Sequence, residues 1–367
     1  MIFGNSFYKK KILITGHTGF KGSWLSLWLK RLDASVYGLS NSIPTLPSNF
    51  EVAQLANEIN HIFCDIRDFK KLKDFVQDIN PDYVFHLAAQ SIVGTSFKNP
   101  LDTYSTNTQG TVNLLECLRH IGKECCAVII TSDKCYENNE WIWGYRENDK
   151  LGGKDPYSAS KAAAEIAIRS YFHTYFEEDS PVKISIARAG NVIGGGDWAL
   201  GRLVPDCMRS WSQNQSVEIK NPKSTRPWQH VLEPLSGYLL LAQTLHENKI
   251  DINGNAFNFG PSNAQNHNVG EVVKYMSEIW GNTKWELTKK TIKDFKESGL
   301  LKLNCDKAID QLNWLPVWDY KDTIYETVNW YKNYYLDKTF QAKDFSINQI
   351  LKFEQHASKK GLKWAIT

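Results

Sequence analysis

The sequence lacks the features that mark a membrane-bound, secreted or disulfide-stabilised protein. No run of eighteen apolar residues occurs in its 367 residues, so we expect no membrane-spanning helix. Residues 1–11 contain no long apolar segment that could act as a signal peptide. The seven cysteines include no Cys-x-x-Cys pair, and their odd number does not suit a disulfide framework or a zinc site. We therefore expect a soluble, cytoplasmic protein.

Charge of one sign is also scarce, because the formal net charge is only +3. No block of five or six like charges occurs, so nothing in the sequence indicates a nucleic-acid-binding tail. Neither His86 nor His230 has a partner at the spacing of metal ligands. We predict no metal, and neither a nucleic acid nor a membrane as a partner.

The first half of the chain alternates short apolar runs with amphipathic stretches. The predicted strands are Lys11–Thr15, Ser35–Leu39, Asn60–Cys64, Tyr83–Leu87, Ala127–Thr131 and Lys183–Ala187. The predicted helices are Gly22–Leu32, Arg67–Ile79, Ser105–His120 and Pro156–Phe176. Strands and helices that alternate in this way predict an α/β fold of the Rossmann type, a doubly wound parallel sheet covered on both faces.

After Ala189 the alternation becomes irregular. The predicted helices are Leu203–Trp211, Leu232–Leu245, Val269–Ile279 and Tyr320–Tyr335, and the predicted strands are Val217–Lys220 and Phe257–Phe259. We interpret residues 1–190 as the Rossmann domain, to which residues 228–262 return. Residues 191–340 would then form mainly a smaller, mixed substrate-binding cap, and the role of residues 341–367 is open.

A glycine-rich turn, Gly16-His17-Thr18-Gly19-Phe20-Lys21-Gly22, separates the first predicted strand from the first predicted helix. Strand, glycine turn and helix in this order are what a dinucleotide-binding turn requires. Gly16 would permit the sharp turn, Gly19 the approach of a pyrophosphate, and Gly22 close packing of the helix on its strand. The spacing differs from Gly-x-Gly-x-x-Gly, and a purely steric role for the three glycines is the alternative.

Tyr157 and Lys161 lie four residues apart in a predicted helix, so their side chains would share one face. A phenol that titrates near pH ~10 is a poor base at neutral pH. An ammonium beside it favours the phenolate and lowers its pKa. The pair could therefore take a proton from a sugar hydroxyl while a hydride leaves the same carbon.

Further candidates lie at the carboxyl ends of the predicted strands, where ligands bind in such sheets. Asp65 and Ile66 follow the third strand, and Asp65 could accept from an adenine amine or equally cap the next helix. The fourth strand ends in Leu87-Ala88-Ala89-Gln90, where small side chains would let the backbone run beside a cofactor, although tight core packing explains the two alanines nearly as well. Ser91, the next residue, is a candidate contact of the substrate. The fifth ends in Thr131-Ser132-Asp133-Lys134, a hydroxyl, a carboxylate and an ammonium in succession.

The glycine turn and the Tyr157–Lys161 pair together resemble the extended short-chain dehydrogenase/reductase superfamily. The longer segments 16–24, 131–136, 188–198 and 224–231 resemble those of CDP-glucose 4,6-dehydratases. This resemblance extends from about Lys11 to Tyr335. It implies bound NAD, a nucleotide diphosphate sugar as substrate, and a homodimer or homotetramer.

The resemblance also implies a reaction in three steps. Tyr157 takes the proton of the C4 hydroxyl as hydride passes to NAD, water is then lost across C5 and C6, and hydride returns to C6. Asp133 would protonate the departing C6 oxygen and Ser132 would hold O4. Lys161 would lower the pKa of the tyrosine and bind the nicotinamide ribose, and Thr131 would lie beside the cofactor.

Several assignments stay open at the level of sequence. Related dehydratases for other nucleotides usually have Glu where this chain has Lys134, so Lys134 is either the C5 base or an enolate stabiliser. Asn191, Arg202 and Arg226 are candidates for the substrate diphosphate, since arginine suits phosphate through its bidentate fork. The second strand ends without a carboxylate that would select NAD and without an arginine that would select NADP. The absence of a cation, together with the resemblance, favours NAD.

Three alternatives to a CDP-glucose dehydratase remain. A 4-epimerase would share Tyr157 and Lys161, but it has no need of Asp133-Lys134. A 4,6-dehydratase for another nucleotide sugar would share the whole set. A non-catalytic dinucleotide-binding protein has no need of the intact Tyr157–Lys161 pair.

Overall fold

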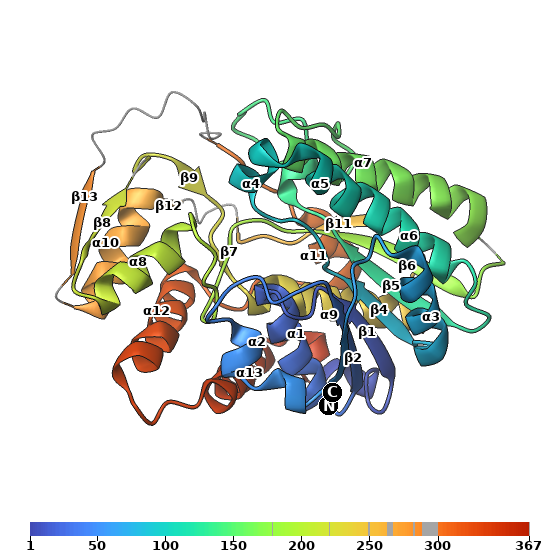
Figure 1. Ribbon diagram of the computed structural model, residues 1–367, viewed down its shortest axis with the longest axis horizontal. Coiled ribbons are helices and arrows are strands. Elements are labelled where there is room, and N and C mark those ends of the chain that lie inside the picture. Colours follow the sequence, from blue (N-terminus) through green and yellow to red (C-terminus); the bar gives the residue numbers. More distant parts are fainter. Residues whose placement is uncertain are drawn as a thin grey trace.

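The protein is built around one parallel sheet of seven strands with helices on both faces (Figure 1). This computed structural model describes residues 1–366 except 178, 220, 249, 263–266, 282 and 288–299. A smaller group of helices and two-stranded ladders lies to one side of the sheet, at the left of Figure 1. The predicted fold class is therefore confirmed.

The glycine turn lies at the point where the order of the strands in the sheet reverses. The order is β11-β6-β5-β4-β1-β2-β3, and every neighbouring pair is parallel. The strands are β1 (Lys11–Thr15), β2 (Ser35–Ser40), β3 (Asn60–Phe63), β4 (Tyr83–His86), β5 (Cys125–Ile130), β6 (Val182–Arg188) and β11 (Ala256–Asn258). The first six differ from the predicted bounds by at most two residues. The order reverses between β1 and β4, and in such sheets a ligand binds at this switch point.

Alternate residues of the central strands β1, β4 and β5 enter two separate cores, which explains why these strands read as continuous apolar runs. Ile12 and Ile14 pack in one core with α1 (Phe20–Arg31) and α9 (Leu232–Glu247). Leu13 faces the other core, which holds α3 (Phe69–Ile79), α6 (Gly110–Leu118) and α7 (Pro156–Tyr171). Both faces of the sheet are thereby covered (Figure 1).

Two predicted helices contain a π-helical turn. The stretch predicted as Ser105–His120 begins with the π turn η3 (Ser105–Gln109) and continues as α6, and α7 ends in the π turn η5 (Phe172–Phe176). Such turns occur often at functional sites. The η3 turn carries Asn107, whose side chain bonds the backbone of Gln90.

The cap consists of helices and ladders from the second half of the chain. They are α8 (Leu203–Ser212), α10 (Val269–Trp280), α12 (Tyr320–Leu336), β7 (Val192–Ile193) with β10 (Gln229–His230), β9 (Thr225–Arg226) with β12 (His267–Asn268), and β8 (Ser216–Ile219) with β13 (Lys284–Leu287). Lys220, the predicted end of the strand at Val217–Lys220, lies outside the described residues.

Parts of the later sequence lie with the sheet. β11 and α9 fall within the returning range 228–262, and α11 (Asp306–Leu312) packs against both, although it lies in the range expected for the cap. The last long helix, α13 (Ala342–Lys359), packs against α1 and α12. Among the described residues, no helix is long and apolar enough to cross a bilayer.

Candidate active site

The glycine turn joins β1 to α1 at the switch point of the sheet. Gly16 has a φ of +79°, and a Cβ there would lie 2.7 Å from the backbone nitrogen of Ala88 on the neighbouring strand end. A Cβ on Gly22 would overlap the carbonyl oxygen of Gly16. Gly19 is the N-cap of α1, and no side chain caps the helix, so its first amides stay available to an anion. The turn therefore has the form of a phosphate cradle.

The side chains of His17 and Thr18 anchor the glycine turn to the end of β2 and to the residues that follow it. The His17 ring is fully buried, and its Nδ1 lies 3.0 Å from the Oγ of Ser40 at the end of β2. Burial lowers the pKa of His17 to about 4, so the ring is neutral. The Thr18 hydroxyl donates to the carbonyl of Ser42 at 2.7 Å. Both side chains are buried and hydrogen-bonded within the protein, and their contact with a cofactor stays a prediction.

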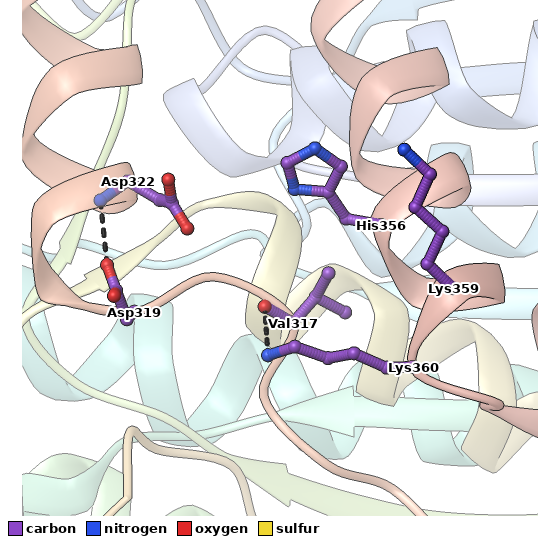
Figure 2. Close-up of a pocket in the computed structure, with 6 residues that line it drawn as sticks. All are labelled: Val317, Asp319, Asp322, His356, Lys359 and Lys360. Atoms are coloured by element: carbon purple, nitrogen blue, oxygen red, sulfur yellow. Dashed lines mark hydrogen bonds between the residues drawn. The ribbon is translucent and has the colours of Figure 1, made fainter.

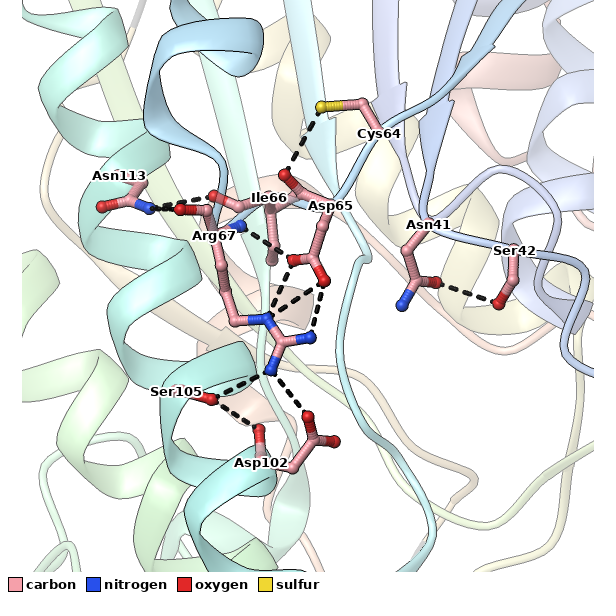
Figure 3. A network of polar contacts seen from close by, with 9 residues as sticks. All are labelled: Asn41, Ser42, Cys64, Asp65, Ile66, Arg67, Asp102, Ser105 and Asn113. Carbon is pink, nitrogen blue, oxygen red and sulfur yellow. Dashed lines mark hydrogen bonds and ion pairs between the residues drawn. The ribbon is translucent and has the colours of Figure 1, made fainter.

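Asp65 follows β3 and is engaged by Arg67. Figure 3 shows the Arg67 guanidinium between two carboxylates, 2.6 Å from Asp65 and 2.6 Å from Asp102. The hydrogen bond from Arg67 lowers the pKa of Asp65. Asp65 is not the helix cap, because the N-cap of α3 is Asp68, whose side chain accepts from the Lys71 amide. An adenine amine would therefore bind a carboxylate that arginine already orients.

Ile66 and the residues after β4 each contact a neighbouring element. Ile66 is buried against Gly110, where a Cβ would overlap its side chain. The Leu87 amide donates to the carbonyl of Thr15 at 2.9 Å, which continues the β1–β4 ladder past the last strand residue. Leu87 and Ala88 therefore pass directly beside the glycine turn at Gly16.

Asn107 ties the end of β4 to the helix that carries the tyrosine. Its amide oxygen accepts from the Gln90 backbone amide at 2.8 Å, and its amide nitrogen donates to the Ser160 hydroxyl at 2.9 Å. Nothing in the sequence indicated a role for Asn107. The π turn that orients it is a feature of the folded chain. Ser91, just beyond, is exposed.

At the end of β5, a 3-10 turn η4 (Asp133–Cys135) begins with Ser132 as its cap. The Ser132 hydroxyl accepts from the Lys134 amide at 3.2 Å and donates to Asp133 Oδ1 at 3.0 Å. Asp133 is buried, and its Oδ2 has no hydrogen-bond partner among the described residues. Lys134 is only partly buried. A Cβ on Gly190, after β6, would overlap the Asp133 carboxyl group, so this glycine makes room for it.

Tyr157 and Lys161 stand on the first two turns of α7. Asp155 caps this helix by accepting from the Ser158 amide at 2.9 Å, and Pro156 occupies its first position. Both side chains are buried, and the Lys161 ammonium donates to the Ile130 carbonyl at 3.3 Å. The helix therefore brings the pair to the end of β5, beside Ser132.

The pKa of Tyr157 does not follow the simple expectation from sequence. Burial raises it to about 12 and the charge of Asp133 acts in the same direction, whereas the hydrogen-bonding contact with Ser132 and the charge of Arg202 act in the opposite direction. Burial lowers the pKa of Lys161 to about 8, and Glu165 opposes this. In the protein alone, desolvation of the phenolate is therefore the largest effect on the Tyr157 pKa, and the lowering of this pKa by Lys161 stays a prediction.

A fully buried ion pair lies next to this end of β5. Arg188 Nε donates to Glu165 Oε1 at 2.8 Å, and the Thr131 hydroxyl donates to the same oxygen at 2.6 Å. Arg188 also donates to Tyr136 Oη at 2.6 Å. Glu165 lies one helical turn beyond Lys161, so the network connects the helix of the Tyr–Lys pair to the Ser132–Asp133 turn. Thr131 thus serves this network rather than pointing to solvent.

The residues expected to bind the substrate diphosphate are spread more widely. Asn191 follows β6 with a φ of +49°, and its amide nitrogen Nδ2 has no partner among the described residues. Arg202 forms an ion pair with Asp197 at 2.7 Å and lies close enough to affect the Tyr157 pKa. Arg226 is buried in the β9–β12 ladder and donates to the Thr225 carbonyl at 2.8 Å. That any of the three binds the diphosphate stays a prediction.

Sequence reasoning missed two further side chains of the site. Lys21 lies between the second and third glycines of the turn, and its ammonium is 3.4 Å from the Tyr238 hydroxyl of α9. Burial lowers the pKa of Lys21 to about 8, and the charge of Asp133 opposes this. Burial also raises the pKa of Tyr238, with Tyr157 and Asp133 acting in the same direction. A lysine inside a glycine turn was the signal that could have found them.

A pocket elsewhere on the surface lies between the start of α12 and the end of α13. Figure 2 shows Asp319 and Asp322 on one side and His356, Lys359 and Lys360 on the other. None of the predicted site residues lines it, so we place no part of the reaction there. Among the described residues, no cluster of His, Cys, Asp or Glu could hold a metal ion.

The sequence is similar to known nucleotide-sugar enzymes over most of its length. The family model described as GDP-mannose 4,6 dehydratase matches residues 13–327. The CDP-glucose 4,6-dehydratase of Salmonella typhimurium is 46% identical over 337 residues, which is 90% of this chain and 93% of the relative. The CDP-paratose 2-epimerase of Salmonella typhi is 25% identical over 87% of this chain and 98% of the relative.

Solved structures share the fold. The UDP-glucose 4-epimerase of Thermotoga maritima, with UDP-glucose, has a TM-score of 0.76 at 22% identity, over 88% of this chain and 99% of that one. The dTDP-glucose 4,6-dehydratase of Bacillus anthracis, in complex with NAD, has a TM-score of 0.72 at 22% identity, over 88% and 97%. The family model covers far more than half of the chain, and with the 46% identical relative it shows that this chain belongs to the GDP-mannose 4,6 dehydratase family.

Proposed function

We propose that the protein converts CDP-glucose to CDP-4-keto-6-deoxyglucose and water with bound NAD. The proposal rests on one observation, that two sets of catalytic side chains lie together at the end of β5. The Tyr157–Lys161 pair lies beside Ser132, and Ser132 donates to the buried carboxylate of Asp133. The choice of CDP-glucose rests on the 46% identical relative of that name.

The turn after β1 fits a dinucleotide. Gly16 and Gly22 have no room for a Cβ, and the uncapped start of α1 suits a pyrophosphate. Asp65, with Arg67 behind it, would meet the adenine, and the backbone at 87–89 would run along the cofactor. NAD, when bound, accepts a hydride from C4 of the sugar and later returns it to C6. The NAD complex of the structurally similar dTDP-glucose 4,6-dehydratase supports this choice over NADP.

Within the site, we assign proton transfers to three groups. Tyr157 takes the proton from the C4 hydroxyl, and Ser132 holds the same oxygen. Asp133 gives a proton to the C6 oxygen, which leaves as water. Lys161 holds the ribose of the cofactor and favours the phenolate. Lys134 is the group that we propose takes the C5 proton. Asn191 and Arg202 are the proposed contacts of the diphosphate.

Mass spectrometry of reaction mixtures tests the proposal. Purified protein with NAD should remove one water from CDP-glucose faster than from dTDP-, GDP- or UDP-glucose. Because the cofactor is restored in each cycle, absorbance of reduced nicotinamide should not accumulate with product. Product without loss of water and with a changed configuration at C4 would favour the 4-epimerase. Stoichiometric cofactor reduction would indicate a simple dehydrogenase.

We also propose a cytoplasmic homo-oligomer, most simply a dimer. All seven cysteines are buried thiols without a disulfide, which suits a reducing compartment. Exposed apolar side chains gather on α4 (Val93–Lys98), α5 (Pro100–Tyr104) and α7, which pack against one another (Figure 1). They include Leu101, Tyr104 and Ile166. Light scattering that gives the mass of one chain would contradict the dimer.

A further inference from the structure

Glu165 of α7 and Arg188 of β6 form an ion pair inside the protein. Both side chains are fully buried, and Arg188 donates to both carboxylate oxygens of Glu165. Removing two charges from water is costly, and apolar side chains of similar volume are often at least as stabilising. We therefore expect this pair to have a role beyond stability.

The pair binds the chain on both sides of the catalytic turn, by which we mean residues 132–134. Immediately before the turn, the Thr131 hydroxyl donates to Glu165 Oε1 at 2.6 Å. Shortly after it, the Tyr136 hydroxyl accepts from Arg188 Nη1 at 2.6 Å. The guanidinium carbon of Arg188 also lies 4.8 Å from the centre of the Tyr136 ring. Both ends of the catalytic turn are thereby held by one ion pair.

Glu165 also fixes how α7 lies along the end of β5. It stands one helical turn beyond Lys161, whose ammonium donates to the Ile130 carbonyl at 3.3 Å. The helix is thus bonded to two consecutive residues of the strand end, to Ile130 through Lys161 and to Thr131 through Glu165. Two such bonds prevent the helix from sliding along the strand. They therefore also determine where Tyr157 lies, one turn before Lys161.

Arg188 fixes the end of β6 against the same turn. It is the last residue of β6, and Gly190 lies two residues further along the chain. A Cβ on Gly190 would lie 1.8 Å from Asp133 Oδ2, so the backbone there is in direct contact with the carboxyl group. Arg188 resists a shift of this segment because it also donates to the Glu147 carbonyl at 2.9 Å. The place of the Asp133 carboxyl group therefore depends on this arginine.

We propose that Glu165 and Arg188 are positioning residues, which hold both ends of the catalytic turn against α7 and β6. The proposal rests on the proposed dehydratase function and deepens it. Both residues are fully buried, so they act through the turn and not on the substrate. They keep the Ser132 hydroxyl and the Asp133 carboxyl group in place, so that proton transfer begins from aligned groups.

Removing one anchoring hydroxyl at a time tests this role. Thr131→Val and Tyr136→Phe each delete one oxygen and keep the shape of the side chain. A misplacement of about 1 Å can slow a reaction by about 10²-fold, so we expect kcat to fall by about ten- to a hundredfold. The KM for the nucleotide sugar and the affinity for NAD should stay close to those of the wild type. Thr131→Ser keeps the hydroxyl and should restore most of kcat.

Thr327→Val and Tyr83→Phe are the matched controls, because each deletes a hydroxyl of a buried side chain outside the site. The Thr327 hydroxyl donates to the Thr323 carbonyl within α12, and the Tyr83 hydroxyl, at the start of β4, donates to the Ser6 carbonyl. Urea unfolding should show a loss of stability in both controls, whereas their kcat should equal that of the wild type. Rates are compared at a temperature at which every variant is folded.

A double variant tests whether both anchors serve one turn. If Thr131 and Tyr136 hold the same turn, releasing the second end should slow catalysis little further. Two effects that multiply would overturn the proposal. So would a normal kcat in both single variants, an equal fall of kcat in the controls, or a Thr131→Val variant whose main defect is weaker NAD binding. A wild type that removes water from no nucleotide sugar would instead refute the proposed function.

Discussion

At the scale of single residues, burial has a larger effect on the chemistry of the site than neighbouring charge. Tyr157 and Lys161 are both buried, so the pKa of the phenol rises to about 12 and the pKa of the ammonium falls to about 8. Each shift disfavours the charged form. Substrate and cofactor would thus meet a neutral base whose activation depends on Ser132, Arg202 and the groups bound beside it.

Removing the phenol oxygen tests the base directly. Tyr157→Phe leaves the ring packing of α7 intact, so folding and NAD binding should be retained. General-base catalysis contributes on the order of 10²–10⁴-fold, and kcat should fall by about that factor. A variant that keeps nearly the wild-type kcat would remove Tyr157 from the mechanism.

The two pKa values also predict how kcat/KM depends on pH. The active form needs a charged Lys161 and an ionised Tyr157. Below a pH of about 8, Lys161 is charged and the phenolate fraction grows tenfold per pH unit. Above pH 8, the lysine loses its charge as fast as the phenolate forms, so kcat/KM should level off.

Lys161→Met distinguishes this explanation from others. Without the titrating ammonium, the much lower kcat/KM of the variant should continue to rise above pH 8. Wild-type activity that declines between pH 6 and 8 would contradict the assigned pair.

At the scale of elements, the site depends on how closely α1 approaches β1 and the end of β4. Gly22→Ala would place a Cβ into the carbonyl oxygen of Gly16 and 2.8 Å from the Cα of His17. The turn would have to open, so we expect NAD affinity to fall by at least about tenfold and the protein to lose stability. Calorimetric titration with NAD and urea unfolding measure both.

Gly122→Ala is the matched control for this prediction. A Cβ there meets no atom within 4 Å, so both NAD affinity and stability should stay close to those of the wild type. Equal behaviour of the two variants would show that the turn tolerates a side chain and would weaken its assignment as a phosphate cradle.

At the scale of the whole molecule, the last residues close the core beside α1. Trp364 of η6 (Lys363–Ala365) stacks on Phe3, with ring centres 4.8 Å apart. Trp28 of α1 donates to Glu354 of α13 at 2.9 Å. The C-terminal segment thereby covers the outer side of the helix that carries the glycine turn.

Removing the Trp364 side chain should destabilise the entire fold. Trp364→Ala leaves a cavity beside Phe3 and Trp28, and we expect the free energy of unfolding to drop by about 3–5 kcal/mol. Ile366→Ala, at an exposed neighbouring position, should change it by less than about 0.5 kcal/mol. Urea unfolding measures both values. A small effect of Trp364→Ala would show that the segment is dispensable for stability.

The sequence by itself determined the sheet, the glycine turn and the Tyr157–Lys161 pair. Continuous apolar runs specify strands buried on both faces, and a spacing of four residues fixes two side chains on one helical face, because both are local periodicities. The positions of Ser132 and Asp133 could also be anticipated, since they follow directly from the end of a strand.

Only the tertiary structure decided which groups meet across the site. Lys21 and Tyr238 are 217 residues apart, and the Asn107 clamp depends on a π turn that no local pattern indicates. The raised pKa of Tyr157 and the burial of Arg226 in a small ladder were likewise beyond sequence reasoning. The reason is physical, because desolvation and long-range contacts depend on what the rest of the chain packs around a residue.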